Sequence, residues 1–526
     1  MRIIILAMLV AGLFHSSFGQ VIYPNHYIKN YLKLLDLENE NFESGITLHP
    51  SIISAYAPDS SLKNDIWDGK FEYLNLDNKR IQVLDPSWSA SFNSKYPRGY
   101  NDGAQWQGKG FNSALNFGVT GRIGILHYTF APVVYMAQNK AYTIVENSAA
   151  RNEFAYPFAH NIDWVQRYGN EPLYAFHPGQ SEVRLVYKKA TIGVSTQNMT
   201  WGPSQFNPIL MSVNAGGFPH IDLGTNAPVN TSIGDVEFKS YWGILKESKY
   251  FDSDDSNNDR YVTGFVLGYR PKFIKGLSLG FNRVLYQRSK DFDFKDVFSG
   301  FSEFFSGSDE ELDGRLVNDA YDQMGSIMVR WLFEEARFET YVEFARNDFS
   351  GGITDFLLQP EHTRAYTLGF IKTGKIQDNT IKFVYEHTNM GNSRTKLTRP
   401  TPTYYIHHIV PQGYTNLGQI LGAGIGPGSN SDQIQLNYYT PNGLLGFEVQ
   451  RIRFNDDYFF SKYAGVEGPP HDVEYTFGFN YLKFMDKVTI NLGVDYSVRT
   501  NWQYLKGKNV GNLYTYFSIT RRLNHN

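Results

Sequence analysis

The sequence has no cysteine in 526 residues and a net charge of only −3. A secreted protein without cysteine does not rely on disulfides, which fits a large structure built from a sheet. The near-neutral charge gives no support for a nucleic-acid partner or for a polybasic membrane patch. After Phe14 no apolar run approaches the roughly 20 residues that a membrane-spanning helix needs. A helical membrane protein and a nucleic-acid-binding protein are therefore not expected.

Common enzyme motifs are missing as well. The chain contains no His-Glu-x-x-His, no Gly-x-Ser-x-Gly and no phosphate-binding glycine loop. The acidic run 252–259 is not an EF-hand, because Asn257 and Thr263 stand where that motif needs Gly and Glu. Glu343 and Asp348 could form an acid/base pair, but ion pairing on a charged strand face is the simpler explanation. We expect no enzyme, no cofactor and no metal site.

The first residues have the pattern of a secretory signal. Arg2 supplies a positive charge, residues 3–14 are almost entirely apolar, and Ser17 and Gly19 are small residues at the −3 and −1 positions of a cleavage site. The sequence predicts a signal peptide over residues 1–19 and a mature chain that begins at Gln20. No cysteine follows the cleavage site, so a lipoprotein anchor is not expected.

What the sequence does contain is aromatic residues, at 16% of the chain, and long runs in which apolar and polar residues alternate. Clear examples are residues 338–344, 473–481 and 488–498. Alternation places apolar side chains on one face of a strand and polar ones on the other. Soluble sandwiches show it too, but their strands are usually about 5–6 residues long. These runs reach about ten residues, the length of a tilted membrane strand, so we predict an all-β fold, a transmembrane antiparallel barrel.

Connection lengths give an independent indication. Bacterial outer-membrane barrels alternate short periplasmic turns with long outer loops and have an even number of strands. Strict alternation of short turns and long loops requires one further strand near residues 217–224. It also requires an upward strand within residues 79–84 or 46–55. The count is then about eighteen, with both termini periplasmic. The short connections lie at 121–124, 188–189, 271–275, 334–335, 374–378, 441–443 and 485–486, and the long ones at 138–180, 200–216, 287–323, 347–363, 389–431, 455–472 and 501–510.

Residues 20–75 differ from the barrel, which we expect to occupy residues 76–526. The spacing of apolar residues over 24–37 is closer to a helical face, and residues 62–67 resemble a short capped helix. We expect short N-terminal helices on the periplasmic side or plugging the mouth. Charges of both signs on the inward strand faces favour a filled lumen, and the glycines at 422, 424, 426 and 428 favour a flexible loop that folds into it.

Several separated sequence blocks, in their order, resemble the Wzi-type capsule-assembly outer-membrane proteins, especially the longer members of that family. The resemblance runs from about Pro97 to the C-terminus. It implies a barrel of about eighteen strands with N-terminal helices and a lectin-like role at the cell surface. An acidic insert around residues 291–313 matches no motif of the family. The blocks span residues 97–108, 176–180, 201–220, 341–348, 361–366 and 412–419.

Candidate binding residues follow from the chemistry of sugars, which offer apolar C–H faces and rings of hydroxyl groups. Aromatic faces and planar polar side chains are suited to bind them. The alternative is that the aromatic residues only pack loops or mark the membrane girdles. The candidates, in the outer loops or in the family-like blocks, are Trp201, Asn207, Asn214, His220, Arg346, Asp348, Tyr404, His407, Gln412, Tyr414, Asn416, Gln419, Trp502 and Tyr504.

The resemblance and the residues together predict an outer-membrane barrel that binds and anchors exported capsular polysaccharide or exopolysaccharide. The alternative is a porin-like channel or transporter for small solutes, which a lumen of one charge sign would favour. The expected partners are the polysaccharide, outer-membrane lipid and the barrel-assembly machinery, with no nucleic acid. The expected location is the outer membrane of a Gram-negative bacterium, with the loops exposed at the cell surface.

Overall fold

The computed structural model describes residues 27–38, 45–49, 65–67, 70, 81–145, 152–252, 254–302, 311–312, 315–316, 321–347, 359–393, 403–463, 466, 468 and 470–523. The expected signal peptide, residues 1–19, lies outside the described residues, as does Asp348. The expected helix over 62–67 is described only at residues 65–67, which form a bend and a turn.

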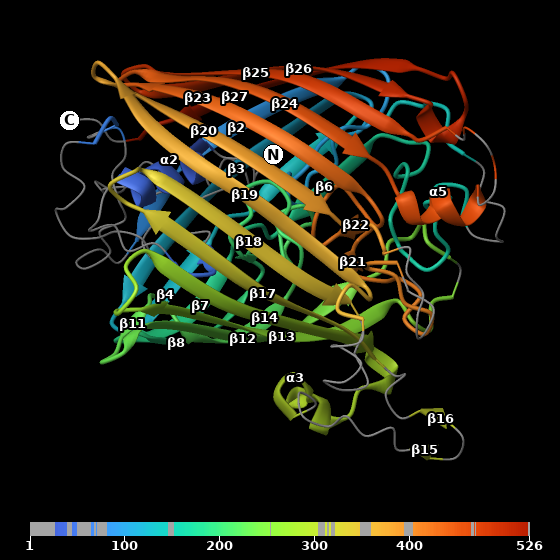
Figure 1. Cartoon of the computed structure of the whole chain (residues 1–526), viewed down its shortest axis with the longest axis horizontal. Coiled ribbons are helices and arrows are strands. Elements are labelled where there is room, and N and C mark those ends of the chain that lie inside the picture. The colour runs from blue at the N-terminus through green and yellow to red at the C-terminus, as the bar shows by residue number, and fades with distance from the viewer. Residues whose placement is uncertain are drawn as a thin grey trace, which may run out of the picture.

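The described strands close into one antiparallel barrel (Figure 1). The wall has eighteen strands, as the sequence predicted. Two of them are interrupted: β4 and β5 both pair with β3 and are halves of one strand, broken at Pro132, and β6 and β7 are halves of the next. The wall strands are β2 (Gln82–Asn93), β3 (Gly110–Ile123), β4 (Leu126–Phe130), β5 (Val133–Ala137), β6 (Leu173–His177), β7 (Glu182–Tyr187), β8 (Ala190–Ser195), β10 (His220–Thr225), β12 (Gly234–Lys246), β13 (Asp259–Pro271), β14 (Leu277–Arg288), β17 (Tyr321–Phe333), β18 (Phe338–Asn347), β19 (Arg364–Ile376), β20 (Asn379–Asn389), β23 (Asn430–Thr440), β24 (Gly443–Arg453), β25 (Val473–Phe484), β26 (Val488–Thr500) and β27 (Val510–Arg521).

The two strands that the sequence supplied only by alternation are both present. The upward strand before β3 is β2, which overlaps the expected residues 79–84 only at its start and continues to Asn93, and the strand expected near residues 217–224 is β10. The last strand, β27, pairs with β2 and closes the barrel, with Ser87 opposite Thr520. Short turns and long loops alternate around the wall, so all long loops gather at one rim and both ends of the wall lie at the short-turn rim.

The two faces of the wall follow the alternation in the sequence. On β26, Thr489, Asn491 and Ser497 are buried inside the barrel, while Leu492 and Tyr496 are exposed on the outside. The same pattern recurs on the other long strands and makes an outward apolar belt of the kind that contacts lipid. Among the described residues, no helix is long and apolar enough to cross a membrane.

The remaining elements are short and lie inside the barrel, at its rims or, in the case of residues 289–302, outside the wall. They are the strands β1 (Leu48–His49), β9 (Thr200–Trp201), β11 (Val229–Asn230), β15 (Glu311–Leu312), β16 (Arg315–Leu316), β21 (Thr415–Asn416) and β22 (Gln419–Ile420), the α-helices α2 (Tyr27–Glu38), α3 (Ser299–Ser302) and α5 (Asp456–Lys462), and the 3-10 helices η2 (Ser289–Asp291), η3 (Phe294–Val297) and η5 (Trp502–Tyr504).

Helix α2 confirms the predicted N-terminal helix and lies in the lumen near the short-turn rim (Figure 1). Its apolar face packs with Trp67 against wall residues that include Phe484. The indole Nε1 of Trp67 donates to the carbonyl of Thr440 at 2.8 Å. Lys382 on β20 donates to the carbonyl of Asn30 at 2.9 Å, so wall side chains fix the helix by its backbone.

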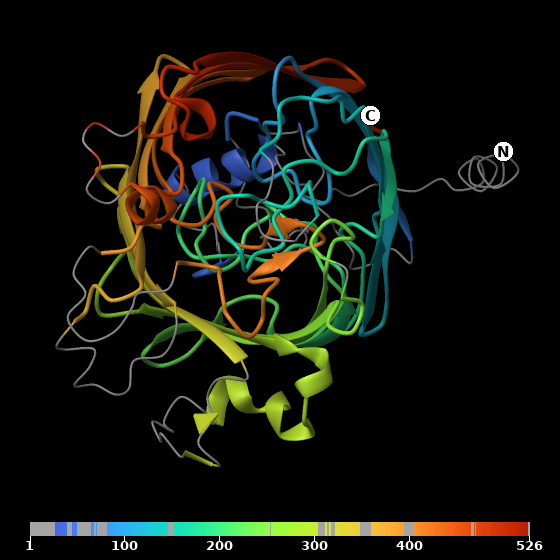
Figure 2. The same ribbon diagram turned by 90° about the vertical axis from the view of Figure 1, so that its right-hand side faces the viewer.

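The part of the lumen near the long-loop rim, which we call the upper lumen, is filled by two loops (Figure 2). These loops, residues 200–216 and 403–429, are called the plug below. Their apolar residues form one core with inward residues of the wall, including Tyr241 and Tyr286. The glycine run folds into the lumen but is tightly packed: a Cβ on Gly422 would lie 2.2 Å from the carbonyl oxygen of Ile209. Close approach of two backbones, and not flexibility, therefore requires glycine here.

Two buried glutamates of the wall bind backbone N–H groups of the lumen segments. Glu237 on β12 accepts from the N–H groups of residues 46–48 at 2.8–3.0 Å. Glu386 on β20 accepts from the N–H groups of Gln205 and Asn207 at 2.6 and 2.9 Å. Each carboxylate thereby satisfies backbone donors that would otherwise be buried without partners, a costly arrangement.

Candidate functional site

A cavity of about 180 Å³ lies among the long loops, between the plug and the strands β24–β27. Most of its walls come from residues 96–107, 142, 156–158, 164–166 and 499–504, and the plug supplies Asn214, Gln419 and Gly424. Ten aromatic side chains line it, which is why a sugar-binding role has to be considered. They are Tyr96, Tyr100, Trp106, Tyr142, Tyr156, Phe158, Trp164, Phe454, Trp502 and Tyr504.

Planar polar side chains alternate with these rings. Amides and guanidinium groups present hydrogen-bond donors and acceptors in fixed planes, which matches the hydroxyl pairs of a sugar. The polar lining residues are Arg98, Asp102, Gln105, Gln107, Gln166, Asn214, Gln419, Arg499 and Gln503.

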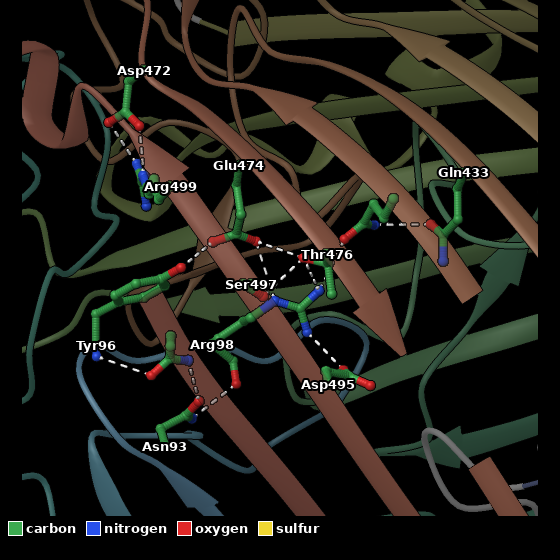
Figure 3. Close-up of polar contacts among 12 residues, drawn as sticks. Asn93, Tyr96, Arg98, Gln433, Asp472, Glu474, Thr476, Asp495, Ser497 and Arg499 are labelled. Carbon is green, nitrogen blue, oxygen red and sulfur yellow. Dashed lines mark hydrogen bonds and ion pairs between the residues drawn. The ribbon is translucent and has the colours of Figure 1, made fainter. Parts of the chain in front are cut away.

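Arg98 lines the cavity and is buried, and its guanidinium is held by polar groups of the wall (Figure 3). Its Nε donates to Glu474 at 3.1 Å and its Nη1 to Asp495 at 2.9 Å. Its Nη2 donates to Gln450 at 3.0 Å and to Thr476 at 3.1 Å. Although burial acts to lower the pKa of Arg98, the two carboxylates raise it above its ordinary value. The guanidinium therefore stays charged and ties the loop after β2 to three wall strands.

A second arginine stands at the rim side of the same cavity (Figure 3). Arg499 forms a two-pronged ion pair with Asp472, at 2.6 and 2.8 Å, and lies over the ring of Phe454 at 3.8 Å. Asp472 also accepts from the backbone N–H of Gln503 at 2.9 Å. Both arginines are thus neutralised by wall carboxylates, and the cavity has no strong excess of either charge.

The rings that line the cavity also pack against one another. Trp502 lies between Tyr96 and Tyr142, with ring centroids 5.7 and 6.3 Å away. Tyr156 packs on Trp164 at 4.5 Å. Burial raises the pKa of Tyr96, Tyr142 and Tyr156, so these phenols stay protonated and can donate hydrogen bonds.

A second cavity of about 230 Å³ lies in the lumen below Arg98. Asp495, the ion-pair partner of Arg98, belongs to its lining, so the guanidinium separates the two cavities. Amide and aromatic side chains both line it, and Asn480 donates to Asn491 at 2.7 Å. The lower cavity is lined by Tyr27, Asn30, Gln435, Asn437, Leu444, Phe447, Glu448, Phe479, Asn480, Asn491, Asp495, Tyr514 and Tyr516, and by the wall glycines Gly446, Gly478 and Gly493.

A family model described as "Capsule assembly protein Wzi" matches residues 128–509. The chain belongs to the Wzi family. The match contains the long loops that carry Tyr142, Tyr156 and Trp164 and the strand-to-loop segment that carries Arg499 and Trp502. The loop of Arg98 precedes it.

The fold is shared with a solved structure. Wzi of Escherichia coli, an outer-membrane protein involved in group 1 capsule assembly and described as a carbohydrate-binding β-barrel, superposes with a TM-score of 0.63 at 11% identity, over 95% of this chain and 99% of that one. OccK7 (OpdD) and OccK8 (OprE) of Pseudomonas aeruginosa each give a TM-score of 0.41 at 9% identity, over 84% and 85% of this chain and 98% of theirs. No curated protein sequence matches.

The structure of this Wzi-family barrel brings only some of the predicted binding residues to the cavity. Trp502, Tyr504, Asn214 and Gln419 line it. Trp201, Tyr404 and Tyr414 are fully buried in the plug core. Their ring faces contact other protein groups, so the role that the structure gives them is packing.

The remaining predicted residues make contacts within the fold, away from the upper cavity. The backbone N–H of Asn207 donates to Glu386 at 2.9 Å, and Asn416 accepts from the N–H of Lys246 at 3.0 Å. The side chain of Gln412 donates to Glu247 at 2.6 Å. His220 on β10 donates to the carbonyl of Phe218 at 2.8 Å. Arg346 on β18 donates to the carbonyl of His362 at 3.0 Å, and His407 lies beside His408 with ring centroids 4.7 Å apart.

The cavity also contains residues that the sequence did not single out as binding residues. Tyr96, Arg98, Tyr100 and Trp106 stand within or beside one of the family-like blocks, in a loop rich in glycine. That combination of aromatic and planar polar residues was the available signal. Among the described residues, no group of three or more His, Asp or Glu is arranged to hold a metal ion.

Proposed function

We propose that this Wzi-family barrel binds exported polysaccharide in the upper cavity and holds it at the cell surface. The observation that carries the proposal is the lining of that cavity, with ten aromatic side chains beside planar polar groups. Covering the C–H face of a sugar with an aromatic ring gives a net gain in free energy. Hydrogen bonds to the hydroxyls mainly replace those to water and add selectivity for the arrangement of the sugar.

The balanced charge of the cavity supports a sugar rather than a small ion. Arg98 and Arg499 are each paired with wall carboxylates, so neither offers an uncompensated charge to an ionic solute. A polymer also needs no tight single site, because many weak contacts along its length add up to strong retention.

The filled lumen supports a role in holding polysaccharide rather than in passing solutes through the barrel. The described plug residues and helix α2 occupy the interior at both ends, and their contacts with the wall are buried. A porin-like channel would need a continuous open path. Conductance in planar bilayers therefore serves as the test of the alternative.

The proposal includes an orientation in the outer membrane. The long-loop rim faces the cell exterior, and both ends of the wall, with α2 near them, face the periplasm. This follows the arrangement of bacterial outer-membrane barrels, whose long loops are extracellular. The barrel-assembly machinery would insert the chain, and lipid would surround the apolar belt. The proposed role is binding, without a catalytic step.

The test uses alanine variants of Trp106, Trp164 and Trp502, singly and together. The control is Trp88→Ala, because Trp88 lies on the outer face of β2, away from the cavity. Binding of oligosaccharides cut from the polysaccharide of the parent strain is measured on purified, folded barrels. Each lost ring is expected to weaken binding by about 2- to 12-fold, from about 0.5–1.5 kcal/mol per stacking contact.

The same variants in cells should move polysaccharide from the cell-attached to the released fraction, most clearly for the triple variant, since avidity hides small losses. A folded triple variant that binds oligosaccharide as tightly as Trp88→Ala would refute the cavity as the site. If the triple variant and the parent protein both conduct small solutes, the channel function replaces the proposed one.

A further inference from the structure

Residues 289–302 form a short flap on the outside of the barrel wall. It contains η2, η3 and α3, and Figures 1 and 2 show α3 outside the wall, next to the strands β12, β13 and β14. Four phenylalanines lie in it, of which Phe294 is 76% and Phe298 59% exposed. The segment belongs to none of the family-like blocks and does not line the upper cavity.

The flap runs from the long-loop rim down the wall. At the rim end, the ring of Phe292 packs on Tyr261 with centroids 4.6 Å apart. At the lower end, Phe301 stacks on Phe265 at 4.9 Å. Since strands rise about 3.3 Å per residue, the four residues from Tyr261 to Phe265 place the lower contact about 13 Å further along the strand. The lower end of the flap therefore lies at the middle of β13, within the outward belt.

The wall under the flap carries three buried polar side chains among aromatic residues such as Trp242 and Phe265. Three outward positions of β12, β13 and β14 are occupied by Ser240, Thr263 and Arg283, and all three side chains are buried. Ser240 and Arg283 are paired with Phe265 across the sheet, and Thr263 precedes Phe265 by two residues on β13. The Nη1 of Arg283 donates to the carbonyl of Gly300 at 3.1 Å. An uncovered arginine at this depth would face hydrocarbon and be destabilising. The flap thus separates a polar strip of the wall from lipid.

The backbone of the flap is itself suited to hydrocarbon. Irregular backbone is tolerated at membrane depth only where its polar groups are satisfied by protein. The N–H groups of Asp296, Phe298 and Phe301 donate within the flap at 2.9–3.0 Å. The carbonyl of Val297 accepts from the indole of Trp242 at 2.8 Å, just as that of Gly300 accepts from Arg283. Polar groups of the wall and backbone groups of the flap satisfy one another.

We propose that the flap is a membrane-seated anchor whose outer face contacts acyl chains of the leaflet on the long-loop side. Phe298 and Phe301 continue the exposed apolar belt formed by Leu267 on β13 and Ile327 on β17. Lys295, 81% exposed in its side chain, lies toward the rim end, where lipid headgroups are. The occupant is lipid, because the flap covers wall surface that a barrel of this class presents to the bilayer.

The absence of cysteine makes the test direct, since one introduced cysteine gives one labelled site. The full-length barrel with Phe298→Cys carries a nitroxide label and is reconstituted into phosphatidylethanolamine–phosphatidylglycerol vesicles. Electron paramagnetic resonance then measures collision with oxygen, which enters lipid, and with a water-soluble nickel chelate. Leu267→Cys is the lipid-facing control, and Lys506→Cys, at an exposed position of a long loop, is the water-facing control.

We expect the label at position 298 to match Leu267→Cys, with high oxygen and low nickel accessibility. Nickel accessibility equal to that of Lys506→Cys would place the flap in water and overturn the proposal. Protection from both reagents would show a protein partner, or a second copy of the chain, on the flap and would overturn it as well. Glycan binding does not enter this measurement, so its result is independent of the proposed function.

Discussion

Arg98 should be the most sensitive single position of the upper cavity. The variant Arg98→Met keeps an unbranched side chain of similar length and removes the guanidinium that bonds to Glu474, Asp495, Gln450 and Thr476. The size of the stability loss depends on the two carboxylates that lose their partner. Glu474 is buried to 1% side-chain exposure, whereas Asp495 keeps 22% and can be hydrated.

Removing one partner of a buried ion pair costs about 3–5 kcal/mol, because the other charge is left uncompensated. Tyr96 still donates to Glu474 at 2.7 Å, and Asp495 can bind water, so the lower end of the range applies. We expect a loss of about 3 kcal/mol in the free energy of unfolding. The double variant Arg98→Met/Glu474→Gln removes the stranded charge and should recover at least about 1 kcal/mol of that loss.

Urea unfolding in lipid vesicles measures both variants, with Arg521→Met as the control. Arg521 is an exposed arginine at the end of β27, and its loss should change stability by less than about 0.5 kcal/mol. The reasoning fails if Arg98→Met is as stable as this control. It also fails if Glu474→Gln makes the Arg98→Met variant less stable instead of more stable, because the stranded charge would then not be the cause.

Three further predictions concern the wall, the loops and pH. Leu492→Arg should cost about 2–4 kcal/mol, because the side chain contacts lipid, and Asn491→Ala, on the inner face, far less; equal losses in urea unfolding would argue against a membrane barrel. A protease site inserted between residues 506 and 507 should be cut on intact cells and one between residues 441 and 442 spared; the reverse would invert the orientation. Burial raises the pKa of Asp163 to about 6 from its ordinary 3.8. The folded state therefore binds this proton more tightly, so its contribution to stability is full below about pH 4 and is lost as the pH rises through about 6. The stability of the parent relative to Asp163→Asn should fall between pH 4 and pH 7, and a constant difference would contradict the burial of this carboxyl.

The wall of the barrel could be predicted because its signal is local. The alternation of apolar and polar residues predicts which face of β26 contacts lipid. The requirement for an even number of strands indicates where a strand too short to be recognised by itself must lie. The six-residue strand β10 was recovered in this way. The break of one strand at Pro132 was not foreseen, because a proline that interrupts a strand looks like any loop proline until the pairing of both halves with β3 is known.

The interior could not be predicted to the same extent. Trp201 and Tyr414 are aromatic loop residues, as are Trp106 and Trp502, and composition does not distinguish a ring that packs a plug from a ring that lines a cavity. The difference arises from long-range contacts, such as the stacking of Tyr414 on Tyr405 at 5.9 Å and its packing on Tyr286. The binding residues proposed from the sequence stay predictions. The cavity in the structure adds the loop that carries Arg98 to the proposed polysaccharide site.

The plug differs in kind from a cork that is a separate domain, because each of its segments is a connection between wall strands. Residues 200–216 join β8 to β10, and residues 403–429 belong to the connection from β20 to β23. A cork attached at one end can swing out and leave a wide pore. A segment anchored at both ends, and also bound by its backbone to Glu386, has no free end to withdraw. Any opening of this lumen would therefore require these loops to rearrange while both of their ends stay attached to the wall.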